Sequence, residues 1–212
     1  MKLYGYFRSS AAYRVRIALN LKGIAVEHVS VHLLKDGGQQ KLPDHLVRNP
    51  QGLVPALQLD DGTLLTQSLA IIEYLDAIKP GPRLVPSDPV KAAKVRAVAL
   101  AIACEIHPLN NLRVLNYLKG ELQHTQEEAD RWYRHWVLEG GLNAVEKMLP
   151  GDAFCYGENP TLADCCLVPQ LFNARRFNVP LDHLPKILRA EESCNALQAF
   201  SDAHPSRQAD AQ

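Results

Sequence analysis

The sequence has few cysteines, and none of them form a CxxC pair. The five cysteines, an odd number, are Cys104, Cys155, Cys165, Cys166 and Cys194. Disulfide-rich folds and thiolate zinc sites need paired cysteines at short, regular spacings. The pattern therefore argues against both, and it favours a reducing compartment. His28 and His32 alternate on one expected strand, but no third ligand accompanies them, so no metal site is predicted.

The chain also lacks an excess of charge of either sign. Lys and Arg together number 23, and so do Asp and Glu. Without a basic block there is no electrostatic footprint for nucleic acid or for an anionic membrane surface. No apolar run approaches the ~20 residues that span a bilayer, and MKLYGYF enters a strand pattern without a secretory apolar region. We therefore expect a cytoplasmic protein without nucleic-acid or membrane partners.

The chain does have enough hydrophobic residues for a sizeable core, because they make up 47% of its 212 residues. Its first part alternates strand and helix signals. The expected elements are strands at 2–7 and 26–33, helices at 10–22 and 39–47, a hairpin of 56–59 with 64–66, and a helix from 68 that Pro80 stops. This order is typical of a thioredoxin-like domain, with the first two strands parallel and the hairpin antiparallel.

A proline-rich stretch separates this domain from the rest. Residues 79–89, KPGPRLVPSDP, contain four prolines, and strand signals nearly vanish beyond them. Helical stretches are expected at 90–119, at 125–149 and from 161 to about 200, whereas 204–212 is expected to be frayed. The sequence thus predicts an α/β thioredoxin-like domain at 1–79, a linker at 80–89 and an all-α domain at 90–212.

Three features of the second half are interpreted as structural. Thr161 and Asp164 have the spacing of a capping box at a helix start. Cys165 and Cys166 follow on the same helix, where buried thiols are usually inert. Trp132 and Trp136 are four residues apart on one helix face, a spacing typical of packing residues.

The first candidate for chemistry is the helix start in YFRSSAAYRVRIALNLKG, where Arg8, Ser9 and Ser10 lie on the first turn. A helix N-terminus has unpaired N–H groups and a partial positive charge, and it stabilises a carboxylate, a phosphate or a thiolate. Since this turn has no cysteine, a thiolate would have to belong to a bound ligand. The alternative is that Ser10 is only an N-cap. Spacing alone leaves both interpretations open.

Two further places in the same domain could contact a peptide-like ligand. Val54-Pro55 precedes a strand, and a cis bond there would turn the Val54 backbone outward. Gln67-Ser68 opens the next helix and offers an amide, a hydroxyl and a second helix N-terminus, which suit an α-carboxylate and an α-amine. The alternative for Ser68 is again a plain helix cap.

Several motifs together resemble one family. They are YFRSSAAYRVRIALNLKGI, LKDGGQQ, NPQGLVPAL, QSLAIIEYLD and TLADCCLVPQLFNARRFNV, and they follow one another in order almost to the tail HPSRQ. The chain is similar to the zeta class of glutathione transferases, the maleylacetoacetate and maleylpyruvate isomerases. The serine motif followed by RVRIAL is specific to that class. The resemblance implies the glutathione transferase fold, glutathione as the cofactor and a homodimer.

The resemblance also assigns roles to individual residues. Ser9 matches the serine at the glutathione sulfur, with Ser10 as its neighbour. The other matches to glutathione-contacting positions are Gln40, the Val54 backbone, the cis-proline Pro55, Gln67, Ser68, and the polar residues His107 and Asn111 of the helical domain. Arg8 and Arg176 match arginines proposed to hold the carboxylates of the substrate. This chain departs from the family at Ala11, where a cysteine is frequent, so no role of that cysteine applies here.

The implied reaction is the cis–trans isomerisation of a maleyl keto acid. A glutathione thiolate adds to the alkene carbon conjugated with the ketone, the resulting single bond rotates, and the thiolate leaves again. Arginine suits a dicarboxylate substrate because it is permanently charged and binds carboxylates bidentately. Two rivals remain: a conjugating transferase or peroxidase with the same glutathione site, and a non-catalytic binding module. The choice between maleylacetoacetate and maleylpyruvate stays open.

Overall fold

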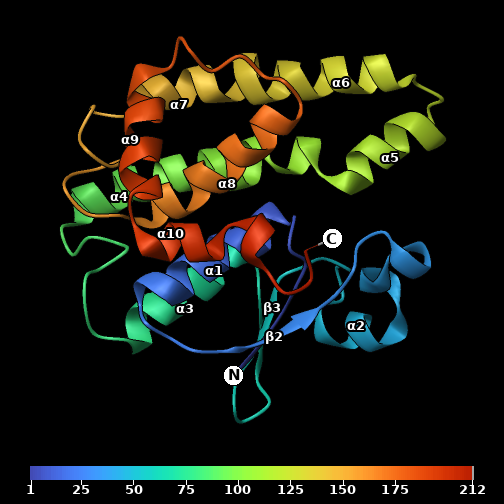
Figure 1. Cartoon of the computed structure of the whole chain (residues 1–212), viewed down its shortest axis with the longest axis horizontal. Coiled ribbons are helices and arrows are strands. Elements are labelled where there is room, and N and C mark those ends of the chain that lie inside the picture. Colours follow the sequence, from blue (N-terminus) through green and yellow to red (C-terminus); the bar gives the residue numbers. More distant parts are fainter. Residues whose placement is uncertain (212) are drawn as a thin grey trace. The chain divides into compact units, whose positions relative to one another are not determined.

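The computed structural model describes residues 1–211 and divides into two compact units. The first unit comprises Met1–Leu84 together with the chain from Asn195 onward, and the second comprises Val85–Cys194. In Figure 1 the first unit therefore contains both the blue-to-teal start of the chain and its red end. Among the described residues, no helix has the length and apolar character needed to cross a membrane.

The first unit is built on a four-stranded sheet with the strand order β2-β1-β3-β4. The strands are β1 (Lys2–Gly5), β2 (Glu27–Ser30), β3 (Ala56–Gln58) and β4 (Leu64–Thr66). β1 pairs with β2 in parallel, whereas the pairs β1–β3 and β3–β4 are antiparallel. β1 and β2 are parallel because a helix crosses between them, and β3 and β4 are antiparallel because the Asp-Asp-Gly turn joins them as a hairpin. Both predictions are confirmed.

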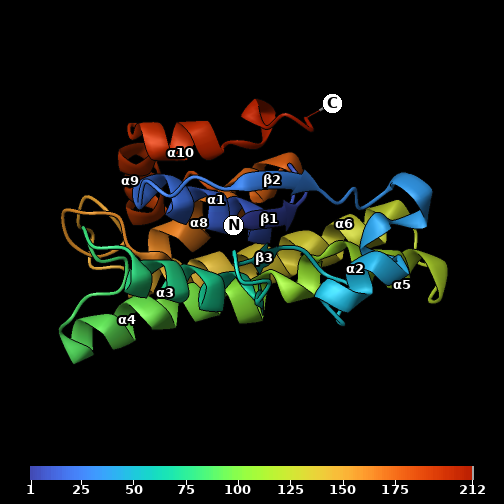
Figure 2. The ribbon, with the colours of Figure 1, turned by 90° about the horizontal axis from the view of Figure 1, so that it is seen from below.

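Three helices of this unit pack together. They are α1 (Ser10–Leu21), α3 (Ser68–Ile78) and α10 (Gln198–Ala203). α1 contacts both α3 and α10, which lie beside it in Figures 1 and 2. α1 also approaches β1 closely, because a Cβ atom on Gly5 would lie 3.2 Å from the Cβ of Ala12. α1 is thus covered on several sides, and it buries residues on more than one face.

A buried ion pair joins the end of α1 to α3. Lys22 Nζ lies 2.9 Å from Asp76 Oδ1, and both side chains are almost fully buried. The same Asp76 carboxylate accepts the N–H of Leu84 at 3.0 Å and the Arg83 Nε–H at 3.1 Å. A buried charge is tolerated when it is paired and hydrogen-bonded, as Asp76 is here. This network fixes the chain where it leaves the first unit.

Two local expectations for the first unit are wrong. The helix expected at 39–47 is a 3-10 turn (Gln39–Lys41) followed by α2 (Pro43–Arg48). Pro43 takes the first helical position, where its missing N–H has no partner to lose, and so it begins the helix. The tail is not frayed over residues 204–211, whereas residue 212 lies outside the described residues. It forms a 3-10 turn (Pro205–Arg207), and the Asp210 carboxylate accepts the backbone N–H of Phe7 at 3.2 Å.

The second unit is helical. Its elements are α4 (Pro89–Leu100), a π-helical segment (Ala101–Ile106), a 3-10 turn (Pro108–Asn110), α5 (Leu112–Gly120), α6 (Gln126–Arg134), a second π-helical segment (His135–Leu142), α7 (Asn143–Met148), α8 (Leu162–Arg176) and α9 (Pro185–Asn195). The stretch at 125–149 is helical throughout, as predicted. The stretch at 90–119 is interrupted, because Pro108 cannot continue the backbone ladder and Asn111 caps a new helix.

α8 lies at the centre of this unit and packs against α4 (Figure 1). The capping box predicted at its start is confirmed, because the Asp164 carboxylate accepts the N–H and the hydroxyl of Thr161 at 2.8 and 2.7 Å. Cys165 and Cys166 are fully buried, in agreement with the structural interpretation. Burial raises the pKa of the thiols of Cys155 and Cys194, so these cysteines are not ionised nucleophiles either.

Candidate active site

The chain between β1 and α1 forms a tight turn that ends at Ser9. The Ser9 N–H donates to the Tyr6 carbonyl at 3.0 Å, which closes the turn from Tyr6 to Ser9. The Ser9 side chain is the N-cap of α1, since its Oγ accepts the N–H of Ala12 at 3.2 Å. Ser9, rather than Ser10, is therefore the capping residue. Ser10 is the first residue of the helix and is 3% exposed.

The capping bond occupies only part of the hydrogen-bonding capacity of the Ser9 hydroxyl. A hydroxyl has one proton to donate and two lone pairs to accept with. The Ala12 N–H occupies one lone pair, and the half-buried Ser9 keeps its proton for another acceptor. A helix cap and a donor to a bound thiolate are consequently compatible functions of one side chain. The two interpretations left open by the sequence do not exclude each other.

Arg8 is oriented by its neighbours in the same turn. Its Nη2–H and Nε–H donate to the Tyr6 hydroxyl at 2.9 and 3.3 Å. The guanidinium lies 5.0 Å from the centroid of the Phe7 ring, within the range of a cation–π contact. Arg8 is half-buried, so a permanent positive charge stands next to the helix start.

The loop before β3 joins this turn through a shared apolar cluster. The Val54–Pro55 peptide bond is cis, as the resemblance predicts. The cluster consists of Tyr4, Tyr6, Phe7, Val31, Val54 and Ala56, with Val29, Leu33 and Ala211 packed against it. Because Phe7 and Val54 belong to one cluster, the residues before Ser9 and those before Pro55 lie in the same part of the first unit.

The start of α3 completes this part of the unit. Gln67 precedes the helix at φ 67° and ψ 116°, a left-handed conformation that is uncommon for a residue with a side chain. Its amide Nε2–H donates to Gln51 Oε1 at 2.6 Å. Ser68 is buried, and its Oγ accepts from Arg14 Nη1 at 3.3 Å. Arg14 lies on α1, so this bond brings the starts of α1 and α3 together.

Gln40 provides an independent test of whether the site suits a peptide-like cofactor. The side chain is 8% exposed, and its Oε1 is buried with no hydrogen-bond partner. Gly38 precedes Gln40 at φ 104°, a conformation that favours glycine, and a Cβ atom there would lie 2.7 Å from Gln40 Nε2 and displace this amide. An orphaned buried acceptor has a free-energy cost that a donor from a ligand removes. Glutathione has amide N–H groups of that kind, so the first unit fits it.

Three of the expected site residues lie on the helical unit. His107 follows the first π-helical segment and is half-buried. Asn111 is the N-cap of α5, because its Oδ1 accepts the N–H groups of Arg113 and Val114 at 3.1 and 3.2 Å. Its amide N–H groups remain able to donate to a ligand.

Arg176 is the third of these residues and ends α8. It is exposed, and its Nη1–H donates to Asn173 Oδ1 at 3.0 Å. Its guanidinium lies 6.0 Å from the Phe177 ring, which stacks on Tyr133 with centroids 3.7 Å apart. Asn173 and Phe177 thus contact one side of the Arg176 guanidinium, and the residue as a whole stays exposed.

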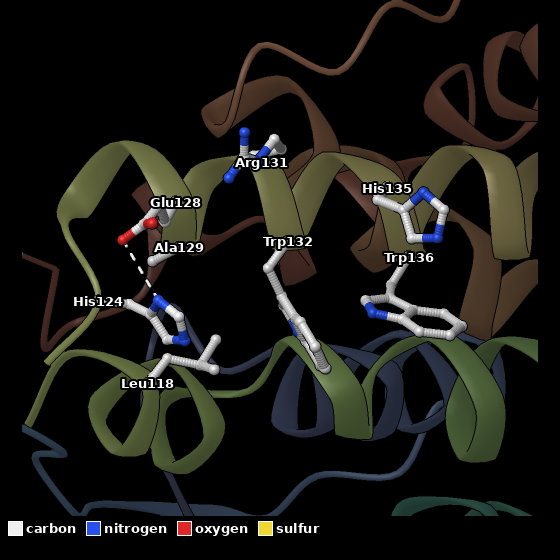
Figure 3. A pocket seen from close by; sticks show the side chains of 8 residues that line it. All are labelled: Leu118, His124, Glu128, Ala129, Arg131, Trp132, His135 and Trp136. Carbon is white, nitrogen blue, oxygen red and sulfur yellow. Dashed lines mark hydrogen bonds and ion pairs between the residues drawn. The ribbon is translucent and has the colours of Figure 1, made fainter. Parts of the chain in front are cut away.

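The helical unit also has a groove of about 360 Å³ that contains none of the expected site residues (Figure 3). Its lining residues come from α5, α6 and their surroundings: Leu118, His124, Glu128, Ala129, Arg131, Trp132, His135 and Trp136. The Trp132 Nε1–H donates to the Leu109 carbonyl at 2.8 Å, and the two indole centroids are 5.7 Å apart. Trp132 thus connects α6 to the 3-10 turn before α5. This agrees with the interpretation of Trp132 as a packing residue.

Sequence reasoning missed several residues that hold the site. Tyr6 orients Arg8, Arg14 binds Ser68, and Gln51 binds Gln67. A signal for Arg14 was present, because YRVRIAL puts two arginines inside an otherwise apolar helix pattern. A buried arginine must have hydrogen-bond partners, so such a pattern indicates a structural or functional contact. Gln51 has no comparable signal.

Comparisons with known proteins agree with this geometry. The family models for the N-terminal and the C-terminal domain of glutathione S-transferases match residues 3–83 and 126–203. A maleylacetoacetate isomerase of Pseudomonas aeruginosa is 50% identical over 210 residues, which cover 99% of this chain and 98% of that protein.

Two solved structures resemble the whole chain. One is the holo structure of a maleyl pyruvate isomerase, a bacterial zeta-class glutathione S-transferase, with a TM-score of 0.95, 41% identity and full coverage of both chains. The other is a maleylacetoacetate isomerase from Methylobacterium extorquens AM1 with bound malonate and GSH, with a TM-score of 0.94, 41% identity and full coverage of both chains. The chain belongs to the glutathione S-transferase family, and within it to the zeta class.

Proposed function

We propose that the chain is a glutathione-dependent cis–trans isomerase of a maleyl keto acid, either maleylacetoacetate or maleylpyruvate. The observation that carries the proposal is the start of α1, where Ser9 retains a proton to donate beside the Arg8 cation and no cysteine is present. Relatives named for each of the two substrates cover 99% and 100% of the chain. A homodimer in the cytoplasm is part of the same proposal.

The residues of the first unit would hold the cofactor. Bound glutathione supplies a thiolate that adds reversibly to the activated double bond. Ser9 and the N-terminus of α1 stabilise the negative charge on that sulfur and so lower its pKa. Gln40, Gln67 and Ser68 hold the peptide and its α-amino acid end, and the backbone of Val54 next to Pro55 pairs with the peptide.

The arginines would select the substrate. Arg8 and Arg176 are permanently charged, and a guanidinium binds a carboxylate through two parallel hydrogen bonds. Charge that develops on the keto oxygen after addition of the thiolate is stabilised by the same cations. His107 and Asn111 provide polar contacts from the helical unit. Because a neutral electrophile would gain nothing from two cations, the pair favours a dicarboxylate.

The test is a side-by-side measurement of kcat/KM for the two maleyl keto acids, with and without glutathione, on the purified chain. We expect isomerisation that requires glutathione. Arg176→Ala should raise the KM for the dicarboxylate about tenfold, the loss expected for one charge-assisted contact, with the KM for glutathione unchanged. Arg134→Ala, which removes another exposed arginine of the helical unit, is the matched control.

Two results would contradict the proposal. If neither substrate isomerises while glutathione is still conjugated to an aryl halide, the chain is a detoxifying transferase. If glutathione does not bind at all, a non-catalytic module is the better description. Unchanged kinetics in Arg176→Ala would remove only this residue from the substrate site.

A further inference from the structure

The turn that presents Arg8 and Ser9 leaves the peptide groups of Phe7 unused. The turn is closed by a hydrogen bond from the Ser9 N–H to the Tyr6 carbonyl. Phe7 lies inside the turn and is 7% exposed, so its N–H and C=O must find other partners. Both partners are side chains from other elements: Asp210 Oδ2 accepts the N–H at 3.2 Å, and Arg16 Nη2–H donates to the C=O at 3.0 Å.

Arg16 connects the turn to α10. Its Nε–H donates to the carbonyl of Ala203, the last residue of α10, at 3.0 Å, while Nη2–H holds Phe7. The side chain is 5% exposed, and its guanidinium lies 5.2 Å from the Tyr13 ring. Burial lowers the pKa of Arg16 to about 10, which still leaves it protonated at neutral pH. A buried cation that bridges two backbone carbonyls fixes the distance between them.

Asp210 reaches the same turn from the other side. Besides the Phe7 N–H, its Oδ2 accepts the Ser30 hydroxyl at 3.0 Å, at the end of β2. The next residue, Ala211, packs against the apolar cluster that contains Phe7 and Val54. The chain from 198 to 211, which we call the C-terminal segment, therefore contacts β2, the turn before α1 and the cluster beside Pro55.

We infer that Arg16 and Asp210 are positioning residues through which the C-terminal segment fixes the backbone on both sides of Phe7, and with it Arg8 and Ser9, for binding and ionising glutathione. The inference rests on the proposed function and deepens it. Both residues act through the backbone of the turn, which their side chains contact. Asp210 holds the N–H of the Tyr6–Phe7 peptide and Arg16 holds the C=O of the Phe7–Arg8 peptide, and this clamp keeps the peptide planes on the two sides of Phe7 from rotating.

The clamp matters because a peptide rotation moves the groups that follow it. Phe7 and Arg8 are the two central residues of the turn, and Ser9 closes it. If either peptide plane beside Phe7 rotates, the Ser9 hydroxyl and the Arg8 guanidinium shift together relative to the sulfur. A misplacement of about 1 Å can lower a rate by as much as ~10²-fold, so these contacts support catalysis by holding Ser9 and Arg8 in place.

The test compares full-length variants of Asp210. Asp210→Ala removes both bonds to the turn and to Ser30, whereas Asp210→Asn keeps a side-chain oxygen able to accept the Phe7 N–H. Asp202→Ala is the matched control, because Asp202 is an exposed carboxylate of the same segment whose side chain, among residues 1–211, binds Gln198 and Arg207 and not the turn. Three quantities are measured for each variant: amide hydrogen exchange of a peptide spanning 7–12, the pKa of the bound glutathione thiol from its thiolate absorbance, and kcat and KM.

We expect faster exchange at 7–12 in Asp210→Ala, by about tenfold to a hundredfold, as for the loss of one hydrogen bond to a charged group. The thiol pKa should rise by about half a unit, and the KM for glutathione by a few fold. Asp210→Asn should restore most of each value, and Asp202→Ala should match the wild type. If Asp210→Ala does not fold, the partial effect of Asp210→Asn on the same readouts decides.

The inference is overturned if exchange at 7–12 and the thiol pKa stay unchanged in Asp210→Ala while the wild type ionises glutathione. It is also overturned if Asp202→Ala gives the same shifts, since the effect would then be a general loosening of the segment. If the wild type does not ionise glutathione, the proposed function itself is wrong. Hydrogen exchange needs no glutathione, so these two failures are distinguishable.

Discussion

At the N-terminus of α1, one hydroxyl has two separable functions. Ser9 Oγ accepts the Ala12 N–H and so stabilises the helix, while its proton remains for a thiolate. The sequence predicts a helix start with two serines there, but spacing cannot say which serine is the cap. That choice depends on the Tyr6–Ser9 turn. The turn ends at Ser9, so the N-cap is Ser9 and the helix begins at Ser10. The role at the sulfur comes from the family resemblance rather than from helix physics.

Substitution of Ser9 can separate the two functions. Ser9→Ala should lose about 1 kcal/mol of unfolding free energy and raise the pKa of bound glutathione toward the value of about 8.5 of a free thiol. Ser9→Asp should keep the stability, because aspartate is an equally good N-cap, yet raise the thiol pKa further through its negative charge. Urea unfolding and thiolate absorbance measure the two effects. A thiol pKa that is equal in all three proteins would remove Ser9 from the sulfur site.

Elements whose signals are local could be predicted. The hairpin, the two crossover strands and the start of α8 follow from turn residues, alternation and capping pairs within a few positions. The π-helical segments Ala101–Ile106 and His135–Leu142 could not be predicted, since a change of one residue per turn scarcely alters an apolar pattern over so short a stretch. The sequence likewise gives no sign that Gln40 Oε1 is buried without a hydrogen-bond partner or that Gln67 has a positive φ. Both depend on how the rest of the unit folds around these residues.

The start of α8 allows a prediction about one element. Asp164 is fully buried and accepts hydrogen bonds from Thr161 and from the Cys155 N–H, the latter at 2.8 Å. Burial raises the pKa of its carboxyl, and these donors act in the opposite direction. Asp164→Ala leaves buried donors without a partner, so we expect a loss of about 3 kcal/mol in unfolding free energy.

Its control is the second capping box of the chain. Glu128 makes the same contact with Thr125 at the start of α6, but in solvent. Glu128→Ala should therefore have a much smaller effect in the same urea titration. Equal losses in the two variants would show that the motif alone, rather than the burial of Asp164, determines the stability.

On the scale of the whole molecule, the first unit is assembled from two distant parts of the chain. The prolines at 79–89 predict a boundary, and the chain does leave the unit after Leu84. Its return at Asn195 could not be predicted, because the polar tail gives no local signal of order. The bond from Phe7 to Asp210 spans 203 positions in sequence, and no periodicity links residues so far apart.

The discontinuity of the first unit predicts how fragments behave. A fragment of residues 1–84 lacks α10, so Arg16 loses the Ala203 carbonyl, Phe7 loses Asp210, and the face of α1 that contacts α10 is exposed to water. Since a domain of this size has little stability to spare, we expect the fragment to show no cooperative thermal transition. Joining residues 195–212 to it through a flexible Gly/Ser linker of about 15 residues should restore the transition. The same joined fragment with residues 195–212 in scrambled order is the control for linker and length. If the fragment 1–84 melts cooperatively at the same Tm as the joined one, the C-terminal segment is not part of this folding unit, and the packing of α1 against α10 adds nothing to its stability.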